Sequence, residues 1–163
     1  EIYPGFINLI KEIRPNQCTL VPDSPEQLTS DHGWQIKDKD HNVVRSIIEE
    51  LQSEDTRISF FVDPDLDQIN TIKELGANRI ELYTGPYAEK PESEIISLYE
   101  TAYYHAKQLG LGVNAGHDLD LDNLKIFLSK VPVDEVSIGH ALISDALEHG
   151  IENVTKRYLD LCK

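Results

Sequence analysis

Two short strings near the C-terminal end place a Gly-His pair where an apolar run ends. They are Val113-Asn114-Ala115-Gly116-His117 and Val136-Ser137-Ile138-Gly139-His140. Glycine at the end of a strand gives the backbone room for a ligand, and histidine can exchange a proton near neutral pH. Two such units, one helical stretch apart, predict a site that binds phosphate and transfers protons. A packing or helix-capping role is the alternative for each histidine.

Glu81 is the most informative carboxylate, because it alternates with apolar residues in Arg79-Ile80-Glu81-Leu82-Tyr83. If Ile80 and Leu82 face covering helices, Glu81 points to the opposite face of the strand. A buried carboxylate is costly unless it is paired or protonated. The pattern therefore predicts a general acid or base with a raised pKa. The alternative is a structural ion pair with an Arg or Lys inside the fold.

Two acidic strings invite a test for a metal site. Asp63-Pro64-Asp65-Leu66-Asp67 and Asp118-Leu119-Asp120-Leu121-Asp122 resemble the start of a calcium loop. Such a loop turns sharply at a glycine in its sixth position, where this chain has Gln68 and Asn123. Aspartate is also favoured at helix N-termini. We therefore expect helix caps and no metal.

The elements that would position these residues alternate between strand-like and helical runs. The apolar stripes at helical spacing predict helices between the strands, and Gly76 and Gly110 suit helix C-termini. Strand, helix, strand with short returns indicates a parallel α/β sheet, either an open doubly wound sheet or part of an eight-stranded barrel. The predicted strands are Gln17–Val21, Arg57–Val62, Arg79–Tyr83, Leu111–Ala115 and Glu135–Ile138.

A barrel explains where the candidate residues fall. Its active site lies where strands end and helices begin, and phosphate favours the last two loops, which here carry both Gly-His pairs. The chain opens with a run that reads like the end of another strand, which favours a barrel cut through its third unit. We expect residues 1–163 to form one partial domain. The long polar stretch 23–41, which contains His32 and Trp34, is expected to be functional.

Composition narrows the class of protein. The formal net charge is −14, which disfavours nucleic acid and anionic membranes as partners. The sequence has no apolar run of the roughly 20 residues needed to span a membrane and no signal peptide. With only Cys18 and Cys162, a disulfide is unsupported and a cytoplasmic location is expected. The chain opens at Glu1 and lacks Met, which predicts a fragment or a processed product.

Taken together, the junction strings resemble the pyridoxine 5'-phosphate synthase family of the deoxyxylulose-dependent vitamin B6 pathway. The resemblance covers the whole chain, and its five pieces occur in the family's order. They are Gln17-Cys18-Thr19-Leu20-Val21-Pro22-Asp23, Leu28-Thr29-Ser30-Asp31-His32-Gly33-Trp34, Ile80-Glu81-Leu82-Tyr83-Thr84-Gly85-Pro86-Tyr87-Ala88, Asn114-Ala115-Gly116-His117 with Leu121-Asp122-Asn123, and Ser137-Ile138-Gly139-His140-Ala141.

The resemblance implies an incomplete TIM (β/α)8 barrel, made of strands 4 to 8 and the end of strand 3. It implies condensation of 3-amino-2-oxopropyl phosphate with 1-deoxy-D-xylulose 5-phosphate to pyridoxine 5'-phosphate, phosphate and water, without a metal or organic cofactor. By similarity, the catalytic residues are Glu1, Glu81 and His117, and the substrate-binding residues are Thr29, Gly116, Gly139 and His140. The family also forms homo-oligomers.

One departure from the family limits the expected activity. The family's Asn-x-Asp-His and His-x-Arg strings, which belong to its first two strands, do not occur here. Against a typical barrel of about 250 residues, the chain corresponds to the last two-thirds. We therefore expect these 163 residues alone to be inactive. The alternatives are a phosphosugar aldolase or isomerase, disfavoured because no predicted strand ends in the Lys that such enzymes usually use, and a piece without activity.

Overall fold

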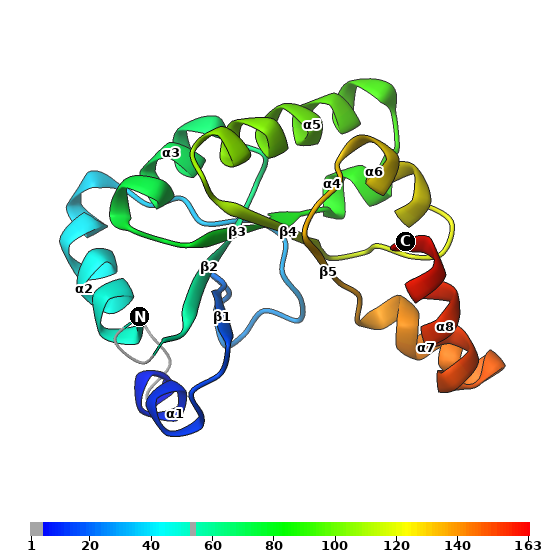
Figure 1. The fold of residues 1–163 in the computed structure, drawn as a ribbon, viewed down its shortest axis with the longest axis horizontal. Helices are drawn as coiled ribbons and strands as arrows, with labels where there is room; N and C mark the ends of the chain where they lie inside the picture. The colour runs from blue at the N-terminus through cyan, green and yellow to red at the C-terminus, as the bar shows by residue number, and fades with distance from the viewer. Residues whose placement is uncertain (1–4, 53–54) are drawn as a thin grey trace.

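The fold is an alternation of parallel strands and helices, seen in a computed structural model that describes residues 5–52 and 55–163 (Figure 1). The strands are β1 (Gln17–Leu20), β2 (Arg57–Val62), β3 (Arg79–Tyr83), β4 (Gly112–Gly116) and β5 (Glu135–Ser137). The helices are α1 (Phe6–Ile13), α2 (His41–Gln52), α3 (Leu66–Leu75), α4 (Gly85–Glu89), α5 (Ser93–Gln108), α6 (Leu124–Lys130), α7 (His140–His149) and α8 (Ile151–Leu161), with a 3-10 turn at Asp38–Asp40.

The five strands form one parallel sheet in the order β1-β2-β3-β4-β5. All five predicted strands are confirmed, with ends that differ from the prediction by at most one residue. Each strand lies beside the one before it in sequence, so the order never reverses as it does in a doubly wound sheet. The sheet is the kind found in α/β barrels, curled into a half-barrel with α3 and α5 over its outer face (Figure 1).

The hydrophobic core lies between the convex face of the sheet and the helices. Alternate strand residues point into it, because successive side chains of a strand face opposite sides. Two tyrosines in this core each use the hydroxyl in a hydrogen bond. Tyr99 donates to the carbonyl of Tyr83 at 2.7 Å, and Tyr87 donates to the carbonyl of Asn123 at 2.8 Å. The core includes Ile58, Phe60, Val62, Ile80, Leu82, Val113 and Ala115 from the strands and Ile48, Leu51, Ile69, Ile72, Ala102, Ala106 and Phe127 from the helices.

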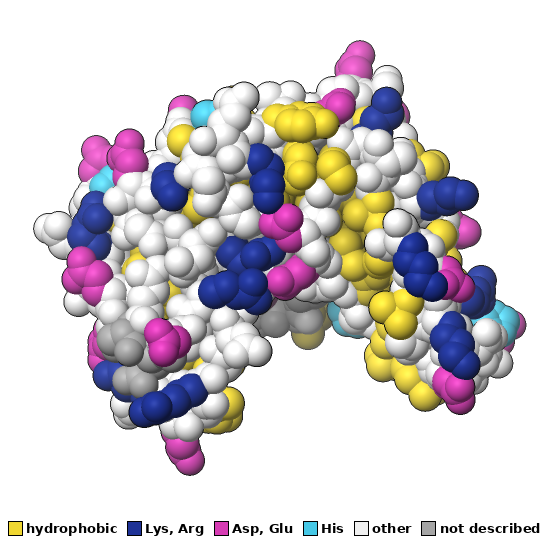
Figure 2. All heavy atoms as spheres, viewed as in Figure 1, with side chains coloured by type: hydrophobic (Ala, Val, Ile, Leu, Met, Phe, Trp, Pro, Cys, Tyr) yellow, Lys and Arg dark blue, Asp and Glu magenta, His cyan; other side chains and the backbone are white. Residues whose placement is uncertain are grey.

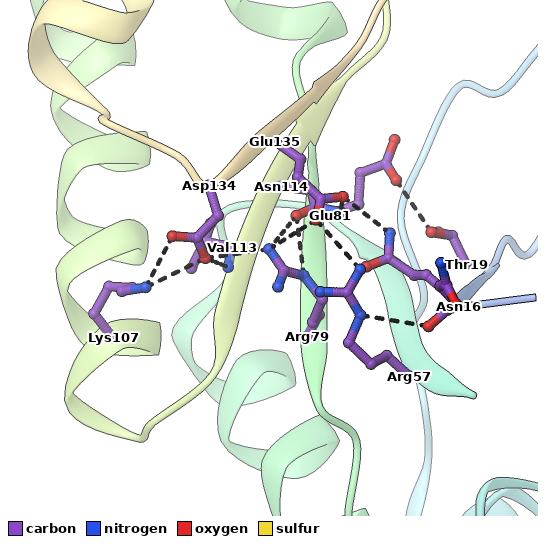
Figure 3. Close-up of polar contacts among 11 residues, drawn as sticks. Asn16, Thr19, Arg57, Arg79, Glu81, Lys107, Val113, Asn114, Asp134 and Glu135 are labelled. Carbon is purple, nitrogen blue, oxygen red and sulfur yellow. Dashed lines mark hydrogen bonds and ion pairs between the residues drawn. The ribbon is translucent and has the colours of Figure 1, made fainter. Parts of the chain in front are cut away.

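The concave face is polar, and its contacts reveal how strongly the sheet curves. A flat sheet would separate β1 from β5 by about 19 Å, which is four strand spacings. Yet Glu135 on β5 accepts hydrogen bonds from Gln17 on β1 at 3.5 Å and from Arg57 on β2 at 3.4 Å. Figure 3 shows Arg79 of β3 and Asn114 of β4 in the same cluster. Side chains from all five strands therefore meet inside the half-barrel.

Helix ends follow the sequence signals. Asp65 accepts hydrogen bonds from the backbone N–H groups of Asp67 and Gln68, so the first acidic string caps α3 as predicted. Gly76 and Gly110 follow α3 and α5 with φ of 102° and 74°, in the left-handed region that favours glycine.

Within the described residues, no three His, Cys, Asp or Glu side chains are grouped so as to hold a metal ion.

The C-terminal helices α7 and α8 pack mainly on each other and project from the end of the sheet (Figure 1). In Figure 2 the lower side of the molecule is hollow between this helix pair, at the right, and the part of the molecule at the left. Several apolar side chains of the pair are exposed, including Leu147 and Ile143. Cys18 is buried and Cys162 exposed, and both are free thiols. None of the helices in the described part of the chain is long and apolar enough to cross a membrane.

Candidate functional site

Glu81 occupies the middle of the concave face, as its alternation with Ile80 and Leu82 predicts. It is 9% exposed, and it forms no ion pair among the described residues. Thr19 on β1 donates to its Oε2 at 3.2 Å, and the hydroxyl of Ser137 on β5 also lies close enough to favour the ionised carboxylate. Burial raises the pKa of Glu81 above its ordinary value; the two hydroxyls oppose this rise and the charge of Glu135 adds to it.

Gly116 ends β4 beside this carboxylate, and its lack of a side chain is what leaves room for it. A Cβ at Gly116 would lie 2.5 Å from Oε1 of Glu81 and 3.0 Å from Cβ of Ser137. Glycine is thus required here by close approach rather than by a turn. Gly116 therefore lies against the buried Glu81 carboxylate, and His117 follows it directly in the sequence.

His117 is partly buried, with both ring nitrogens in hydrogen bonds. Nδ1 lies 2.9 Å from Oδ2 of Asp118, and Nε2 lies 2.9 Å from Oγ1 of Thr29. The ring packs edge-on against Tyr83, with centroids 5.2 Å apart. Its backbone is fixed by Thr84, whose hydroxyl contacts the carbonyl oxygens of Gly116 and His117. The structure thus brings the predicted residues Thr29 and His117 together, although they are far apart in sequence.

The polar stretch after β1 reaches His117 because its second half is anchored to the end of β2. The N–H of Gly33 donates to Asp63, the N–H of Trp34 donates to the carbonyl of Phe61 at 2.9 Å, and the indole of Trp34 donates to the carbonyl of Leu20 at 2.8 Å. A Cβ at Gly33 would lie 2.3 Å from the backbone nitrogen of Asp63, so the contact requires glycine. Thr29 belongs to the same stretch, and its hydroxyl lies beside Nε2 of His117.

His32 lies on the exposed part of the same stretch, where its Nδ1 contacts the carboxylate of Asp31. It contacts neither His117 nor Glu81 through any hydrogen bond or ring contact that the described residues show. Its closure over a ligand remains a prediction.

The second Gly-His pair lines an open cavity of about 430 Å³ between α4, the turn before α6 and the start of α7. Gly139 and His140 are exposed there, at the first turn of α7. No side chain caps this helix, so its first N–H groups are open to a ligand. Neither Glu81 nor His117 lines the cavity. Asp118 does, and its carboxylate also contacts His117, so it connects the two parts of the site.

Several residues that shape the site were not predicted from the sequence. Thr19 and Ser137 follow the period of two that marks the concave face, which is a signal that could have found them. Asp118 was interpreted only as part of an acidic string, and Thr84 was named only within one of the strings that resemble the family. Glu1, the remaining predicted catalytic residue, lies outside the described residues.

Comparisons with known proteins identify the family to which the chain belongs. A family model described as pyridoxal phosphate biosynthesis protein PdxJ matches residues 1–163. The pyridoxine 5'-phosphate synthase of Porphyromonas gingivalis is 48% identical over 95% of the chain, and that of Chelativorans sp. is 46% identical over all of it. The chain spans 66% and 69% of these two relatives, and 62% of the synthase of Leptospira biflexa.

Solved structures show the fold. The tryptophan synthase A-subunit of Pyrococcus furiosus superposes with a TM-score of 0.64 at 16% identity, covering 96% of this chain and 60% of that one. The BexX/CysO complex of Amycolatopsis orientalis gives 0.61 at 12% identity, covering 95% and 59%. The strong evidence is at the level of sequence: because a family model matches the chain from end to end and curated relatives are nearly half identical, the chain belongs to the PdxJ family.

Proposed function

We propose that this chain carries a large part of the active site of a pyridoxine 5'-phosphate synthase. The reaction would condense 3-amino-2-oxopropyl phosphate with 1-deoxy-D-xylulose 5-phosphate to give pyridoxine 5'-phosphate, phosphate and water. The observation that carries the proposal is the end-to-end match to relatives that bear this name. The buried Glu81 and the doubly hydrogen-bonded His117, on either side of Gly116, are consistent with it.

The reaction makes one imine, eliminates phosphate and closes a ring, and each step moves a proton. We assign proton transfer to His117 and Glu81. Burial favours the neutral acid at Glu81, so it is suited to donate a proton or a hydrogen bond. His117 lies nearer the solvent-exposed end of the strands and can accept and return a proton through its ring. Glu1 would be a third catalytic group.

Phosphate binding is assigned to Gly139 and His140. The free N–H groups at the start of α7 attract an anion, which matters because the chain as a whole repels one. Glu89, Asp118 and Asp120 line the far side of the same cavity and would hold the phosphate toward α7 by repulsion. Gly116 and Thr29 would contact the reacting part of the substrate beside His117.

We further propose that the five strands are five of the eight strands of a TIM barrel. The support is the curvature, which brings β1 and β5 side chains together, and a polar concave face that is open below (Figure 2). On this view residues 1–163 form one partial barrel domain and are inactive alone. A cytoplasmic location and homo-oligomer formation remain part of the proposal.

The test compares two proteins in an assay for pyridoxine 5'-phosphate. One is the 163-residue chain, and the other is the same chain fused at residue 1 to the preceding third of the Porphyromonas gingivalis relative. We expect activity in the fusion and none in the chain alone. In the fusion, His117→Gln and Glu81→Gln should each lower kcat by about 10²- to 10⁴-fold, the range for lost acid–base catalysis.

The matched control is His149→Gln, since His149 is exposed at the end of α7 and outside the site. It should leave kcat unchanged. A folded fusion without activity would contradict the proposed reaction. Full activity of either site variant would contradict the role assigned to that residue, and turnover by the 163-residue chain would contradict the claim that it is incomplete.

A further inference from the structure

We propose that Asp118 is a positioning residue for His117: its carboxylate holds the proton on Nδ1, so that Nε2 is the ring atom that exchanges protons with substrate. This inference rests on the proposed function for its catalytic meaning. The tautomer of the His117 ring is inferred from its hydrogen bonds alone and does not depend on that function.

The hydrogen bonds on the two ring nitrogens define the tautomer. An ionised carboxylate can only accept hydrogen bonds, so the 2.9 Å contact from Nδ1 to Oδ2 of Asp118 places the proton on Nδ1. In the neutral ring, Nε2 then carries the lone pair and accepts from the hydroxyl of Thr29 at 2.9 Å. The ring is held from the side by Tyr83, at an interplanar angle of 76°. Only Nε2 is left for a substrate that displaces Thr29.

The backbone indicates that Asp118 is present for its side chain. His117 and Asp118 both have positive φ, at 90° and 57°, a conformation that glycine adopts without strain. Thr84 holds this turn from the other side, through the carbonyls of Gly116 and His117. The turn itself would therefore form more easily with glycine at position 118. Asp118 thus adopts a conformation that glycine adopts more easily, and its carboxylate contacts the His117 ring.

Asp118 both lines the cavity at α7 and contacts the His117 ring. Its side chain is 48% exposed and lines the cavity next to Gly139 and His140, while it also binds His117. A substrate whose phosphate lies at α7 thus has Asp118 between its anionic end and the acid–base ring. The carboxylate would fix the ring before substrate arrives, which is how outer-shell partners act on catalytic and metal-binding histidines.

The first test reads the tautomer directly, by ¹⁵N NMR of the 163-residue chain labelled at histidine, with the His117 signals assigned from His117→Gln. We expect the proton on Nδ1 in the wild type. Asp118→Gly should abolish that preference, whereas Asp122→Asn removes a charge from the same acidic string without contacting the ring and should preserve it. Thr29→Val should also preserve it, because Asp118 sets the tautomer. A wild-type ring protonated on Nε2, or an unchanged tautomer in Asp118→Gly, would overturn the inference.

The second test measures kcat and KM in the fusion described above. Asp118→Gly should lower kcat by about 10- to 100-fold, the usual effect of losing an outer-shell partner, with a smaller change in KM. Asp122→Asn should stay within about twofold of the wild type, as surface changes do. Urea unfolding should show Asp118→Gly at least as stable as the wild type, since the positive φ is relieved; a purely structural role predicts the reverse.

The two tests separate the inference from the proposed function. If the tautomer changes in Asp118→Gly but kcat does not, Asp118 orients the ring and the catalytic role of His117 is wrong. If the wild-type fusion makes no pyridoxine 5'-phosphate, the reaction is wrong and NMR alone decides the tautomer. If kcat falls while the tautomer is unchanged, Asp118 acts by another route and the inference is refuted.

Discussion

Replacing Arg79 by methionine should destabilise the fold by about 3 kcal/mol, because its guanidinium holds several strands together at the concave face (Figure 3). It is 11% exposed and donates to Oδ1 of Asn114 from Nε at 3.1 Å and from Nη2 at 2.8 Å. It also pairs with Asp134 at 3.2 Å and with Glu135 at 3.6 Å. Methionine fills the space of the side chain but donates no hydrogen bond, so a buried Asn114 oxygen loses both of these donors.

The magnitude follows from what each partner keeps. Asp134 retains Lys107, and Glu135 retains Arg57, so the ion pairs lose only part of their stabilisation. The larger loss is at Asn114, which is 1% exposed. Urea unfolding followed by circular dichroism gives the free energy of unfolding. In thermal unfolding followed the same way, the midpoint temperature should fall by about 6 to 12 °C.

Arg57→Met is the matched control for this prediction. Arg57 also reaches Glu135, but its side chain is 45% exposed, so its removal should cost no more than about 1 kcal/mol. A loss below about 1 kcal/mol for the Arg79 variant would refute the reasoning. An equal loss for both variants would refute it as well, because burial would then not be what makes Arg79 important.

Three further predictions concern stability and pH. Glu81→Gln should raise the free energy of unfolding progressively as the pH rises above the ordinary pKa of a glutamate carboxyl, because the unfolded wild type then gains from ionising while burial raises the pKa of Glu81 in the folded state; in acid, where the carboxyl is protonated in both states, it should leave the free energy of unfolding unchanged. Urea titrations in acid and near neutral pH check this, and a gain independent of pH would contradict it. Gly116→Ala should cost about 1 to 3 kcal/mol, since its Cβ would lie 2.5 Å from Glu81 and 3.0 Å from Ser137, and an unchanged urea midpoint would show that the carboxylate moves aside freely. Asp65→Ala should cost about 1 kcal/mol by removing the cap of α3, measured as a shift in midpoint against Asp67→Ala, which keeps the cap and should lose less.

Local patterns were enough to predict the strands and the orientation of Glu81. In each strand, apolar and polar residues alternate or the apolar run ends at a clear boundary. Because side chains of a strand alternate between its two faces, the sequence alone predicts which of them share a face. Glu81 therefore points away from the helices, as expected from Ile80 and Leu82 alone. The raised pKa followed from the same pattern, because a carboxylate inside the sheet loses its water.

The partners of Glu81 depend on curvature, which no local pattern records. Thr19 lies two strands away on one side and Ser137 two strands away on the other, and they meet Glu81 only because the sheet curls. The start of α6 also depends on a side-chain contact. The carboxylate of Asp120 binds the N–H groups of Asp122 and Asn123 and holds a turn there, and the helix begins at Leu124.

The convex face of the sheet carries the hydrophobic core, and the concave face carries the candidate site. The convex face buries its apolar residues under the chain's own helices. The concave face instead gathers polar groups, and two of them, Oγ of Ser59 and Oε1 of Gln17, are buried without a hydrogen-bond partner among the residues that the structure describes. Buried polar atoms are rarely left unpaired, so this face is built to meet further polar groups. We therefore expect folding and activity to respond differently to the further strands that the proposed barrel would add: folding depends on the convex face, and activity on what faces Glu81 and His117.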